Sequence, residues 1–232
     1  MSVTNEPITT QISDNVRRLL GKVLGQPEDS QVTAGNGADP LLRQSKGLRE
    51  FCGTIRSPEG LQVLDLGAAS QANINFVTGL GHRLCTEDLY ASLQATPSRS
   101  PRGPEPDAEP EETRFCRENL RYAPGQFDGI LCWDLLDLLP DAIVKPLVER
   151  LYQLLKPGGS LLTFFHAGQP GQLLPICQYR IHSQEVLQVK ERAQGKLSRS
   201  FNNRGIESLF RNFASLKFYL TKDSLREVVI VR

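Results

Sequence analysis

The chain has 232 residues, of which 39% are hydrophobic and 23% charged, with a formal net charge of +1. This length suits one sizeable domain and is short for two. A near-neutral chain has no global field that would draw it onto nucleic acid or an anionic membrane, so neither is expected as a partner. Because no apolar stretch is long enough to span a bilayer and the polar N-terminus lacks a signal-peptide pattern, we expect a cytoplasmic protein.

Five cysteines are scattered along the chain without any C-x-x-C pairing, and several lie inside apolar runs. An odd number in this arrangement predicts reduced, buried thiols rather than a disulfide framework. The cysteines and histidines lack the spacing of zinc ligands, and neither G-x-S-x-G nor G-x-x-x-x-G-K-[ST] occurs. The sequence therefore argues against a metal hydrolase, a serine hydrolase and a P-loop nucleotide hydrolase.

Residues 1–47 are expected to form an N-terminal extension, with a short amphipathic helix over Ile12–Leu24 followed by a flexible, turn-rich tether. A second helix is predicted over Leu41–Ile55, directly before the first strand. The main domain is placed at residues 48–232. Within it, residues 97–112 hold five prolines with acids and arginines and no large apolar residue, which predicts a mobile surface insert.

From Leu61 onward the apolar runs alternate between strand-like and helix-like periods, which is typical of βα units around a mostly parallel sheet. Runs such as GILCW and SLLTFF are almost continuously apolar, as strands buried on both faces are. Only a few residues separate the last two strands, too few for a parallel crossover, so these strands must form an antiparallel hairpin. The predicted strands are Leu61–Leu66, Arg83–Glu87, Arg114–Arg117, Gly129–Trp133, Ser160–Phe165, Ser215–Leu220 and Glu227–Val231. The predicted helices between them include Asn73–Thr78, Asp141–Leu155 and Ile206–Phe213.

Ligands of open α/β sheets bind at the carboxyl ends of the strands, so the loop after the first strand is the first candidate. It reads Asp65-Leu66-Gly67-Ala68-Ala69-Ser70-Gln71, an acid and a glycine followed by small residues that let a ligand approach backbone N–H groups. A plain tight turn with a buried aspartate cap is the alternative interpretation. Alanines stand at the second and third glycine positions of the dinucleotide fingerprint G-x-G-x-x-G, which disfavours a nicotinamide cofactor.

Two adjacent acids, Glu87 and Asp88, follow the second strand about twenty residues after Gly67, where a carboxylate can accept both hydroxyls of a ribose. We favour Asp88, and the other interpretation is that both acids are simply solvated. Three further motifs follow in order. They are Glu118-Asn119-Leu120, the run FDGILCWD that ends at Asp134, and the turn LLKPGG before the fifth strand.

This ordered set of motifs resembles the class I S-adenosylmethionine-dependent methyltransferases over roughly Leu48–Arg232. The resemblance implies an α/β fold, a Rossmann-like three-layer α/β/α sandwich. Its seven-stranded, mostly parallel sheet would have the order 3-2-1-4-5-7-6 with strand seven antiparallel, in agreement with the terminal hairpin. The glycine turn departs from the family pattern G-x-G-x-G, because only Gly67 is kept and Ala69 and Gln71 take the other two positions.

The resemblance also implies S-adenosylmethionine as the cofactor, held by the loops that follow the strands. The first turn would shape the pocket for the methionine portion, and the acid after the second strand would hold the ribose hydroxyls. The polar pair ahead of the fourth strand would surround the adenine, and the end of that strand would face the sulfonium methyl. In this order the residues are Asp65, Gly67 and Ala69, then Asp88, then Glu118, Asn119 and Leu120, and finally Trp133 with Asp134.

A sulfonium methyl is already activated by its charge, so the protein mainly has to hold a nucleophile in line with the C–S bond. A general base is needed only for a protonated nucleophile. The candidates are Asp134 and His166, with His166 preferred because it directly follows the fifth strand. The alternative is a hydrogen-bonded loop histidine without a chemical role. Basic residues between Gln169 and Arg204 would suit an anionic acceptor or an acidic partner, or would form a solvated face.

The leading hypothesis is therefore methyl transfer from S-adenosylmethionine to an unidentified acceptor, a small molecule or another protein, with a small molecule preferred. A second hypothesis is a methyltransferase-like binding or scaffold protein without catalytic activity, because a fold does not guarantee its usual chemistry. A third, nicotinamide-dependent reduction, would require a dinucleotide to bind despite Ala69 and Ala72.

Overall fold

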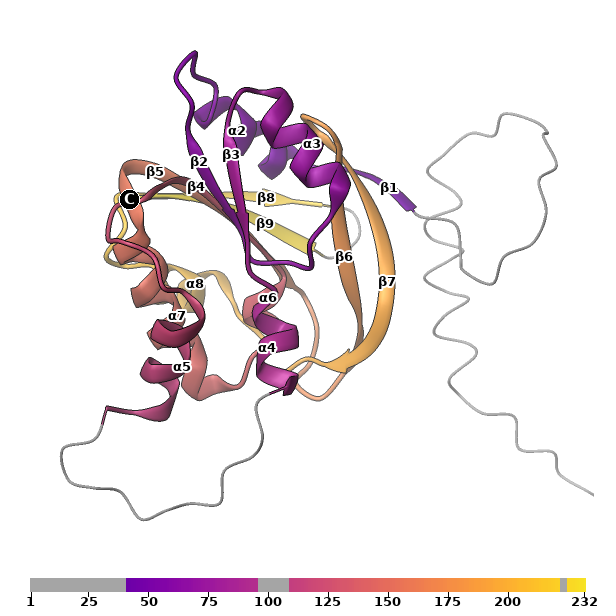
Figure 1. Ribbon diagram of the computed structural model, residues 1–232. Helices are drawn as coiled ribbons and strands as arrows, with labels where there is room; N and C mark the ends of the chain where they lie inside the picture. The colour runs from indigo at the N-terminus through magenta and orange to yellow at the C-terminus, as the bar shows by residue number, and fades with distance from the viewer. Residues whose placement is uncertain (1–40, 96–108, 222–224) are drawn as a thin grey trace, which may run out of the picture. The chain divides into compact units, whose positions relative to one another are not determined.

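The computed structural model describes residues 41–95, 109–221 and 225–232. The central element is a six-stranded sheet with the order β3-β2-β4-β5-β9-β8 (Figure 1). The strands β2, β3, β4 and β5 run parallel, and β9 is antiparallel to both of its neighbours. The strands are β2 (Gln62–Asp65), β3 (Arg83–Thr86), β4 (Phe127–Trp133), β5 (Leu155–His166), β8 (Ser215–Leu220) and β9 (Leu225–Val231).

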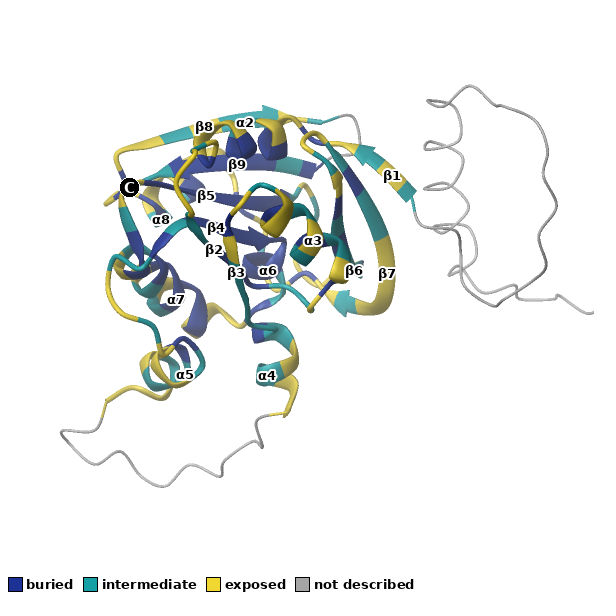
Figure 2. Cartoon of the chain, turned by 45° about the horizontal axis from the view of Figure 1, so that its top comes forward, coloured by how far each residue is buried: buried dark blue, intermediate teal, exposed yellow. Residues whose placement is uncertain are grey.

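Successive side chains of a strand point to opposite faces, and here both faces are buried (Figure 2). Leu64 and Ile130 pack with residues of α5, α7 and α8, whereas their neighbours Val63 and Leu131 pack with residues of α2 and α3. This arrangement is the predicted three-layer α/β/α sandwich. The helices are α2 (Lys46–Thr54), α3 (Gln71–Gly79), α4 (Leu89–Ala95), α5 (Glu111–Asn119), α6 (Leu135–Leu138), α7 (Asp141–Leu154) and α8 (Asn203–Leu209).

Six of the seven predicted strands form, and the last two pair as the predicted antiparallel hairpin. The prediction of a strand at Arg114–Arg117 is wrong, because these residues lie within α5. Glu111 and Glu112 in the first turn and Arg117 in the last complement the helix dipole. Helical spacing also buries Cys116 in the core. Among the described residues, the sheet therefore has six strands rather than seven, and β3 lies at its edge.

A second sheet was not anticipated from the sequence. Its three antiparallel strands have the order β1-β7-β6, with β1 at Leu41–Gln44, β6 at Leu173–Ser183 and β7 at Val186–Lys196. The predicted helix over Leu41–Ile55 is thus divided into β1 and α2. Ser45 marks the division, because its hydroxyl accepts a hydrogen bond from the backbone N–H of Leu48 and caps α2.

The segment containing β1 and α2 is attached to the central sheet by a buried ion pair. Arg43 Nη1 lies 2.5 Å from Glu227 Oε1, and the side chains are 9% and 0% exposed. The second carboxylate oxygen of Glu227 accepts the backbone N–H of Gly47 at 2.6 Å. Both oxygens therefore have donors, as a buried charge requires. The predicted boundary after residue 47 stays a prediction. The predicted helix over Ile12–Leu24 and residues 97–108 of the predicted insert at 97–112 lie outside the described residues, whereas Glu111 and Glu112 of that insert begin α5.

All five cysteines are free thiols, of which Cys52, Cys116 and Cys132 are buried. His82 is structural: its Nδ1 accepts the N–H of Leu61, and its Nε2 lies 2.7 Å from the carbonyl oxygen of Ile55. Among the described residues, no helix combines the length and the apolar character that crossing a membrane needs. Within the same ranges, no group of three or more His, Cys, Asp or Glu side chains is arranged to hold a metal ion.

Candidate active site

A pocket of about 510 Å³ opens beside the carboxyl ends of β2 and β4. We call it the strand-end pocket. Three parts of the chain line it: the turn after β2 together with Asp88 and α4, the end of β4 with α6, and the inner face of the β6–β7 hairpin. The lining residues include Gly67, Ala68, Asp88, Tyr90, Gln94, Trp133, Asp134, Leu135, Leu138, Ile176, Arg192 and Ala193.

Asp65 organises the turn after β2 from within the protein. It is fully buried, and its carboxylate accepts hydrogen bonds from the backbone N–H of Gly67 at 3.0 Å, Trp133 Nε1 at 2.7 Å and Asn73 Nδ2 at 2.8 Å. Burial raises the pKa of Asp65, and the three donors oppose that shift. Asn73 also binds the backbone of Tyr179 and Ile181, so the turn is fastened to β6.

The turn closes without the two further glycines of the family pattern. Among the described residues, Trp133 is the one non-glycine residue whose backbone lies in the left-handed region, with a φ of 52°. Ala69 and Gln71 therefore do not have the backbone strain of that region. Gln71 is exposed and bonds to Asn75, and the carbonyl oxygen of Ala69 accepts from Gln178 on β6. Ala68 lines the strand-end pocket, whereas Ala69 lies outside its lining.

A glycine is required at position 67 because the Trp133 indole lies very close to this part of the backbone. A methyl group at this position would lie 2.9 Å from Cδ1 of Trp133. The indole cannot easily move, because it is bonded to Asp65 and stacked on Tyr179 with ring centroids 5.2 Å apart. We expect Gly67→Ala to lower the free energy of unfolding by about 1–3 kcal/mol through overpacking.

The control is Gly53→Ala in α2, where nothing lies within 4 Å of the added carbon. This variant should gain up to about 1 kcal/mol, because alanine favours the helix over glycine. Urea denaturation of both variants measures the contrast. Equal changes in the two variants would contradict the close packing at Gly67.

The two acids after β3 have separate surroundings. Asp88 lines the strand-end pocket, accepts the backbone N–H of Ala91 at 3.0 Å, and has Arg192 Nη1 of β7 at 3.6 Å. Glu87 lies outside the lining and accepts the hydroxyl of Tyr122 at 2.6 Å. Of the two acids, Asp88 is therefore the one that a molecule in the pocket would meet.

Asp134 is a buried carboxyl in the wall of the strand-end pocket. It is 4% exposed, and the buried hydroxyl of Tyr179 donates to its Oδ2 at 2.8 Å. Burial raises the pKa of Asp134 to about 6, while the charge of His166 and the Tyr179 hydrogen bond act in the opposite direction. Asp134 thus changes charge within the range in which the protein would be assayed.

This raised pKa predicts how stability depends on pH. Between pH 4 and 6 the folded protein holds a proton on Asp134 that the unfolded chain releases, so the contribution of this carboxyl to stability falls as pH rises through that window. Asp134→Asn removes the effect and keeps an acceptor for Tyr179. The variant's stability relative to the wild type should be on the order of 3 kcal/mol more favourable at pH 7 than at pH 4.

Denaturant unfolding at the two pH values measures this difference, with the exposed substitution Glu207→Gln as control. A stability difference between Asp134→Asn and the wild type that does not change with pH would contradict the raised pKa.

His166 is held by an acid that the sequence analysis missed. Asp137 Oδ2 accepts both the backbone N–H of His166 at 2.6 Å and ring Nδ1 at 3.0 Å. Asp137 is fully buried on α6, and the side chain of His166 is 18% exposed. The available signal was the D-x-x-D spacing of Asp134 and Asp137, one helical turn apart. His166 is not in the lining of the strand-end pocket. Asp134 is in that lining, and the charge of His166 lowers the pKa of Asp134.

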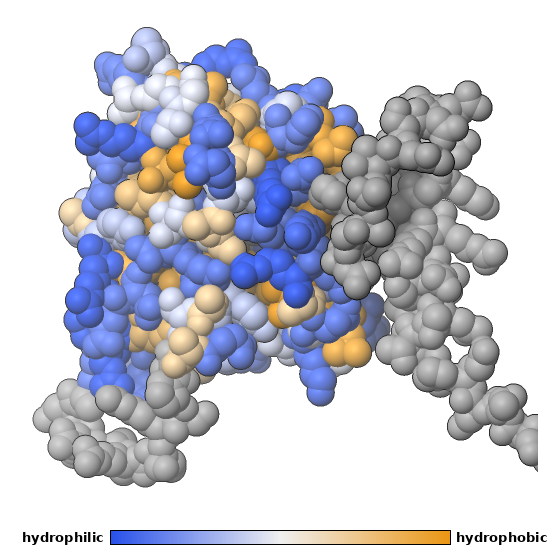
Figure 3. Space-filling model, turned by 45° about the vertical axis from the view of Figure 1, so that its right-hand side comes forward, coloured by the Kyte–Doolittle hydropathy of each residue, from blue (hydrophilic) through white to orange (hydrophobic). Residues whose placement is uncertain are grey.

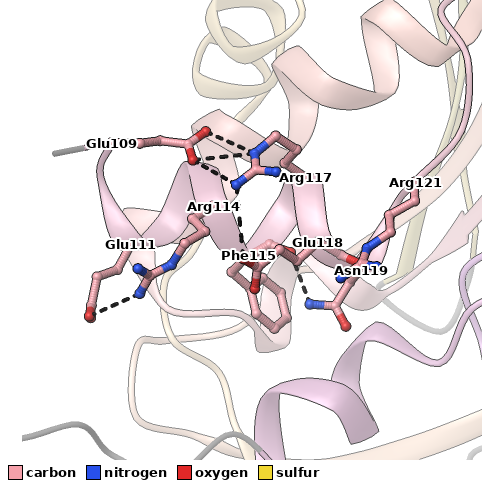
Figure 4. A network of polar contacts seen from close by, with 8 residues as sticks. All are labelled: Glu109, Glu111, Arg114, Phe115, Arg117, Glu118, Asn119 and Arg121. Carbon is pink, nitrogen blue, oxygen red and sulfur yellow. Dashed lines mark hydrogen bonds and ion pairs between the residues drawn. The ribbon is translucent and has the colours of Figure 1, made fainter.

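The structure does not bring the predicted adenine residues to the strand-end pocket. Glu118 and Asn119 end α5, among the charged side chains of that helix (Figure 4). Glu118 is exposed beside Arg117, and Asn119 donates to the carbonyl oxygen of Phe115 at 2.9 Å. Leu120 is fully buried in the core. Their role in binding adenine stays a prediction, while Tyr90 and Gln94 of α4 lie in the pocket next to Asp88.

The basic residues of the β6–β7 hairpin are mostly on the solvent side. Lys190 and Lys196 are exposed, and Arg192, half exposed, is the one that lines the strand-end pocket. Figure 3 shows this side of the molecule as largely hydrophilic, with smaller hydrophobic areas between. Most of the positive charge of the β6–β7 hairpin therefore lies on a solvated face. The inner face of the hairpin contributes apolar residues such as Ile176 and Ala193 to the lining of the strand-end pocket.

The strand-end pocket fits S-adenosylmethionine. Its volume is within the roughly 300–1,000 Å³ of typical ligand sites. Gly67 and Ala68 line the pocket, Asp88 provides a carboxylate for the ribose, and the buried Asp134 provides one for a cation. No residue of the altered glycine turn closes the pocket.

A family model described as a methyltransferase domain matches residues 9–213. No curated protein matches the chain. Similar solved structures include an S-adenosylmethionine-dependent methyltransferase from Methanosarcina mazei, 14% identical over 76% of this chain and 94% of that one, with a TM-score of 0.44. Another, from Archaeoglobus fulgidus, is 8% identical over 80% and 91%, with a TM-score of 0.47. Because the family model spans most of the sequence, the chain belongs to the class I S-adenosylmethionine-dependent methyltransferases, and S-adenosylmethionine is its cofactor.

Proposed function

We propose that the protein transfers a methyl group to a small molecule bound in the strand-end pocket beside the cofactor. The observation that carries this proposal is the pocket itself, which combines Gly67, Asp88 and Asp134 at the carboxyl ends of the strands. The far side of the pocket is formed by apolar side chains of α6 and the β6–β7 hairpin. A pocket of this volume suits a small molecule.

The proposed roles follow the positions of the residues. Asp88 would accept the ribose hydroxyls, and the backbone at Gly67 and Ala68 would receive the methionine portion. Trp133 would form the floor beside them, because its indole packs directly on Gly67. Asp134 would face the sulfonium, where a negative carboxylate favours the positive charge. The cofactor supplies an electrophilic methyl, and the chain's own residues orient the acceptor and receive any proton that it loses.

The neighbouring acids provide a matched test of the ribose contact. Asp88→Asn should weaken S-adenosylhomocysteine binding about 10- to 150-fold, because a hydrogen bond to a charged acceptor contributes about 1.5–3 kcal/mol. Glu87→Gln should leave the affinity nearly unchanged, since Glu87 bonds to Tyr122 outside the pocket lining. Calorimetric titration of both variants measures the difference. A greater loss in Glu87→Gln than in Asp88→Asn would assign the ribose to the other acid.

Transfer itself is tested by the release of S-adenosylhomocysteine from S-adenosylmethionine in the presence of acceptor panels. One panel holds small hydroxyl, amine and thiol compounds, and the other holds unfolded and folded proteins. The proposal expects release with members of the first panel, reduced in Asp88→Asn. Release with the proteins alone would assign a macromolecular acceptor. Tight cofactor binding without release in either panel would favour the scaffold hypothesis.

A further inference from the structure

Tyr179 of β6 is held in place by its ring and by its backbone. The buried ring stacks on Trp133, with the centroids 5.2 Å apart and an interplanar angle of 11°, and packs edge-on against Phe164. The carbonyl oxygen of Tyr179 accepts a hydrogen bond from Asn73 Nδ2 at 3.1 Å. Burial raises the pKa of Tyr179 well above its usual value, so the hydroxyl keeps its proton under assay conditions. Tyr179 therefore presents a hydrogen-bond donor at a fixed position.

The hydroxyl of Tyr179 donates to Asp134, whose Oδ2 lies 2.8 Å away. Asp134 directly follows β4, is buried, and lines the strand-end pocket. A hydrogen bond from a neutral donor stabilises the carboxylate, whereas burial stabilises the uncharged acid. The charge of this wall of the pocket thus depends on a donor that the β6–β7 hairpin supplies.

The basic side chains near the pocket are each paired with a different acid. Arg192 lies 3.6 Å from Asp88, and the ring of His166 lies 3.0 Å from Asp137. In the part of the chain that the structure describes, no basic side chain forms an ion pair with Asp134. A carboxylate removed from water is stabilised by a cation close to it. A cationic ligand in the strand-end pocket would supply that charge.

We infer that Tyr179 is a positioning residue that holds Asp134 as the counter-charge of the sulfonium, so that the site prefers S-adenosylmethionine to its product S-adenosylhomocysteine. The inference rests on the proposed function, which places the sulfur beside Asp134. When the methyl carbon bonds to the acceptor, the electrons of the C–S bond stay on sulfur, and the sulfonium becomes a neutral thioether. The contact with Asp134 then loses its charge, which favours release of the product over the cofactor.

The preference should depend on pH, because the charge of Asp134 does. The titratable or charged groups around Asp134 are Cys132 of β4, His166 of β5, Cys177 and Tyr179 of β6, Asp137 of α6, and Arg192 of β7 in the same pocket lining. Burial raises the pKa of each of the two thiols to about 12, so they stay neutral in an assay. Burial also raises the pKa of Asp134 to about 6, so this carboxyl gains its charge as pH rises through that value.

The two ligands share their adenosine, amino and carboxylate groups, so the ratio of their affinities isolates the sulfonium charge. Only about one tenth of a carboxyl with a pKa near 6 is charged at pH 5. The preference for S-adenosylmethionine should therefore be about tenfold smaller at pH 5 than at pH 7.5. Calorimetric titration of the full chain with each ligand at both pH values measures it. A ratio that is the same at the two pH values would overturn the inference.

Asp134→Asn tests whether this carboxyl is the group responsible. Asparagine keeps an acceptor for the hydroxyl of Tyr179 and has no charge to gain. The affinity ratio in this variant should be the same at pH 5 and pH 7.5 and close to the wild-type ratio at pH 5. The variant keeps His166, the other group near Asp134 that can titrate in this range. A ratio that still falls about tenfold in Asp134→Asn would assign the effect to another group and overturn the inference.

Tyr179→Phe tests the positioning role, because it removes the hydroxyl and keeps the ring that stacks on Trp133. Without the donor, the pH at which the affinity ratio changes should move upward, while S-adenosylhomocysteine binding stays near the wild-type level. Tyr122→Phe is the matched control, since that hydroxyl donates to Glu87 outside the pocket lining, and it should keep the wild-type ratio. An unmoved pH midpoint in Tyr179→Phe, or an equal loss of both ligands at every pH, would overturn the positioning role.

Failure of the proposed function gives a different pattern of results. If neither ligand binds, or if Asp88→Asn weakens neither, the proposed function is overturned and the inference with it. If both ligands bind and Asp88→Asn weakens both, an affinity ratio that does not respond to pH overturns the inference alone. Trp133 is the single tryptophan of the chain and lines the strand-end pocket, so a change in its fluorescence with each ligand supports binding there. Should Tyr179→Phe not fold, the wild type and Asp134→Asn still decide.

Discussion

Replacing Glu227 with leucine is expected to destabilise the protein by about 3–5 kcal/mol, because it breaks a buried ion pair and puts an apolar side chain against the Arg43 guanidinium. The substitution also removes the acceptor for the backbone N–H of Gly47 at the start of α2. Both losses fall on the attachment between the β1–α2 segment and β9. Urea unfolding followed by circular dichroism measures the change in the free energy of unfolding.

The double variant Arg43→Met, Glu227→Leu is the control. It replaces both buried charges with apolar side chains, so it should recover much of the stability lost in Glu227→Leu. The stability that the double variant still lacks relative to the wild type measures the loss of the hydrogen bond from the backbone N–H of Gly47. A Glu227→Leu variant within about 0.5 kcal/mol of the wild type, the usual range for surface substitutions, would contradict the buried pair.

Replacing His166 with glutamine is expected to slow methyl transfer about 10²- to 10⁴-fold, which is the usual contribution of a general base. Glutamine keeps a donor for Asp137 but cannot accept a proton at the position of Nε2. Because the histidine is not in the lining of the strand-end pocket, the affinity for S-adenosylhomocysteine should change little. The rate is measured as S-adenosylhomocysteine release with an acceptor found in the panel.

His182→Gln provides the matched control, since His182 is exposed on β6. It should keep the wild-type rate. If His166→Gln also kept that rate, His166 would be a hydrogen-bonded loop histidine, and Asp134 would remain as the candidate base.

Long, strongly patterned elements of the fold could be predicted from the sequence, and short ones could not. The buried runs of β4 and β5 and the amphipathic pattern of α7 each carry a clear period, and all three form. The segment Arg114–Arg117 is so short that its pattern also fits a strand. The structure shows that it belongs to a helix over Glu111–Asn119. The β6–β7 hairpin was missed because its solvent side is mixed polar and gives no simple alternation.

For the candidate site, the sequence could identify residues that belong to one local motif or follow it at a fixed spacing. Spacing after Gly67 pointed to the adjacent acids Glu87 and Asp88, and the favoured one, Asp88, lines the strand-end pocket, whereas Glu87 does not. Contacts between distant residues left no such signal. Asp137 and His166 are 29 positions apart, and Asp134 and Tyr179 are 45 apart, so only the arrangement of α6, β5 and β6 brings each pair together.

The most direct test of the account is a crystal structure of the full chain with S-adenosylhomocysteine. We expect the ligand in the strand-end pocket, with its ribose hydroxyls within hydrogen-bond distance of Asp88, its methionine portion over Gly67 and its sulfur facing Asp134. Tyr90 and Gln94 would then lie beside the adenine. Ligand bound elsewhere, such as between α7 and α8, or an empty strand-end pocket at millimolar ligand, would contradict it.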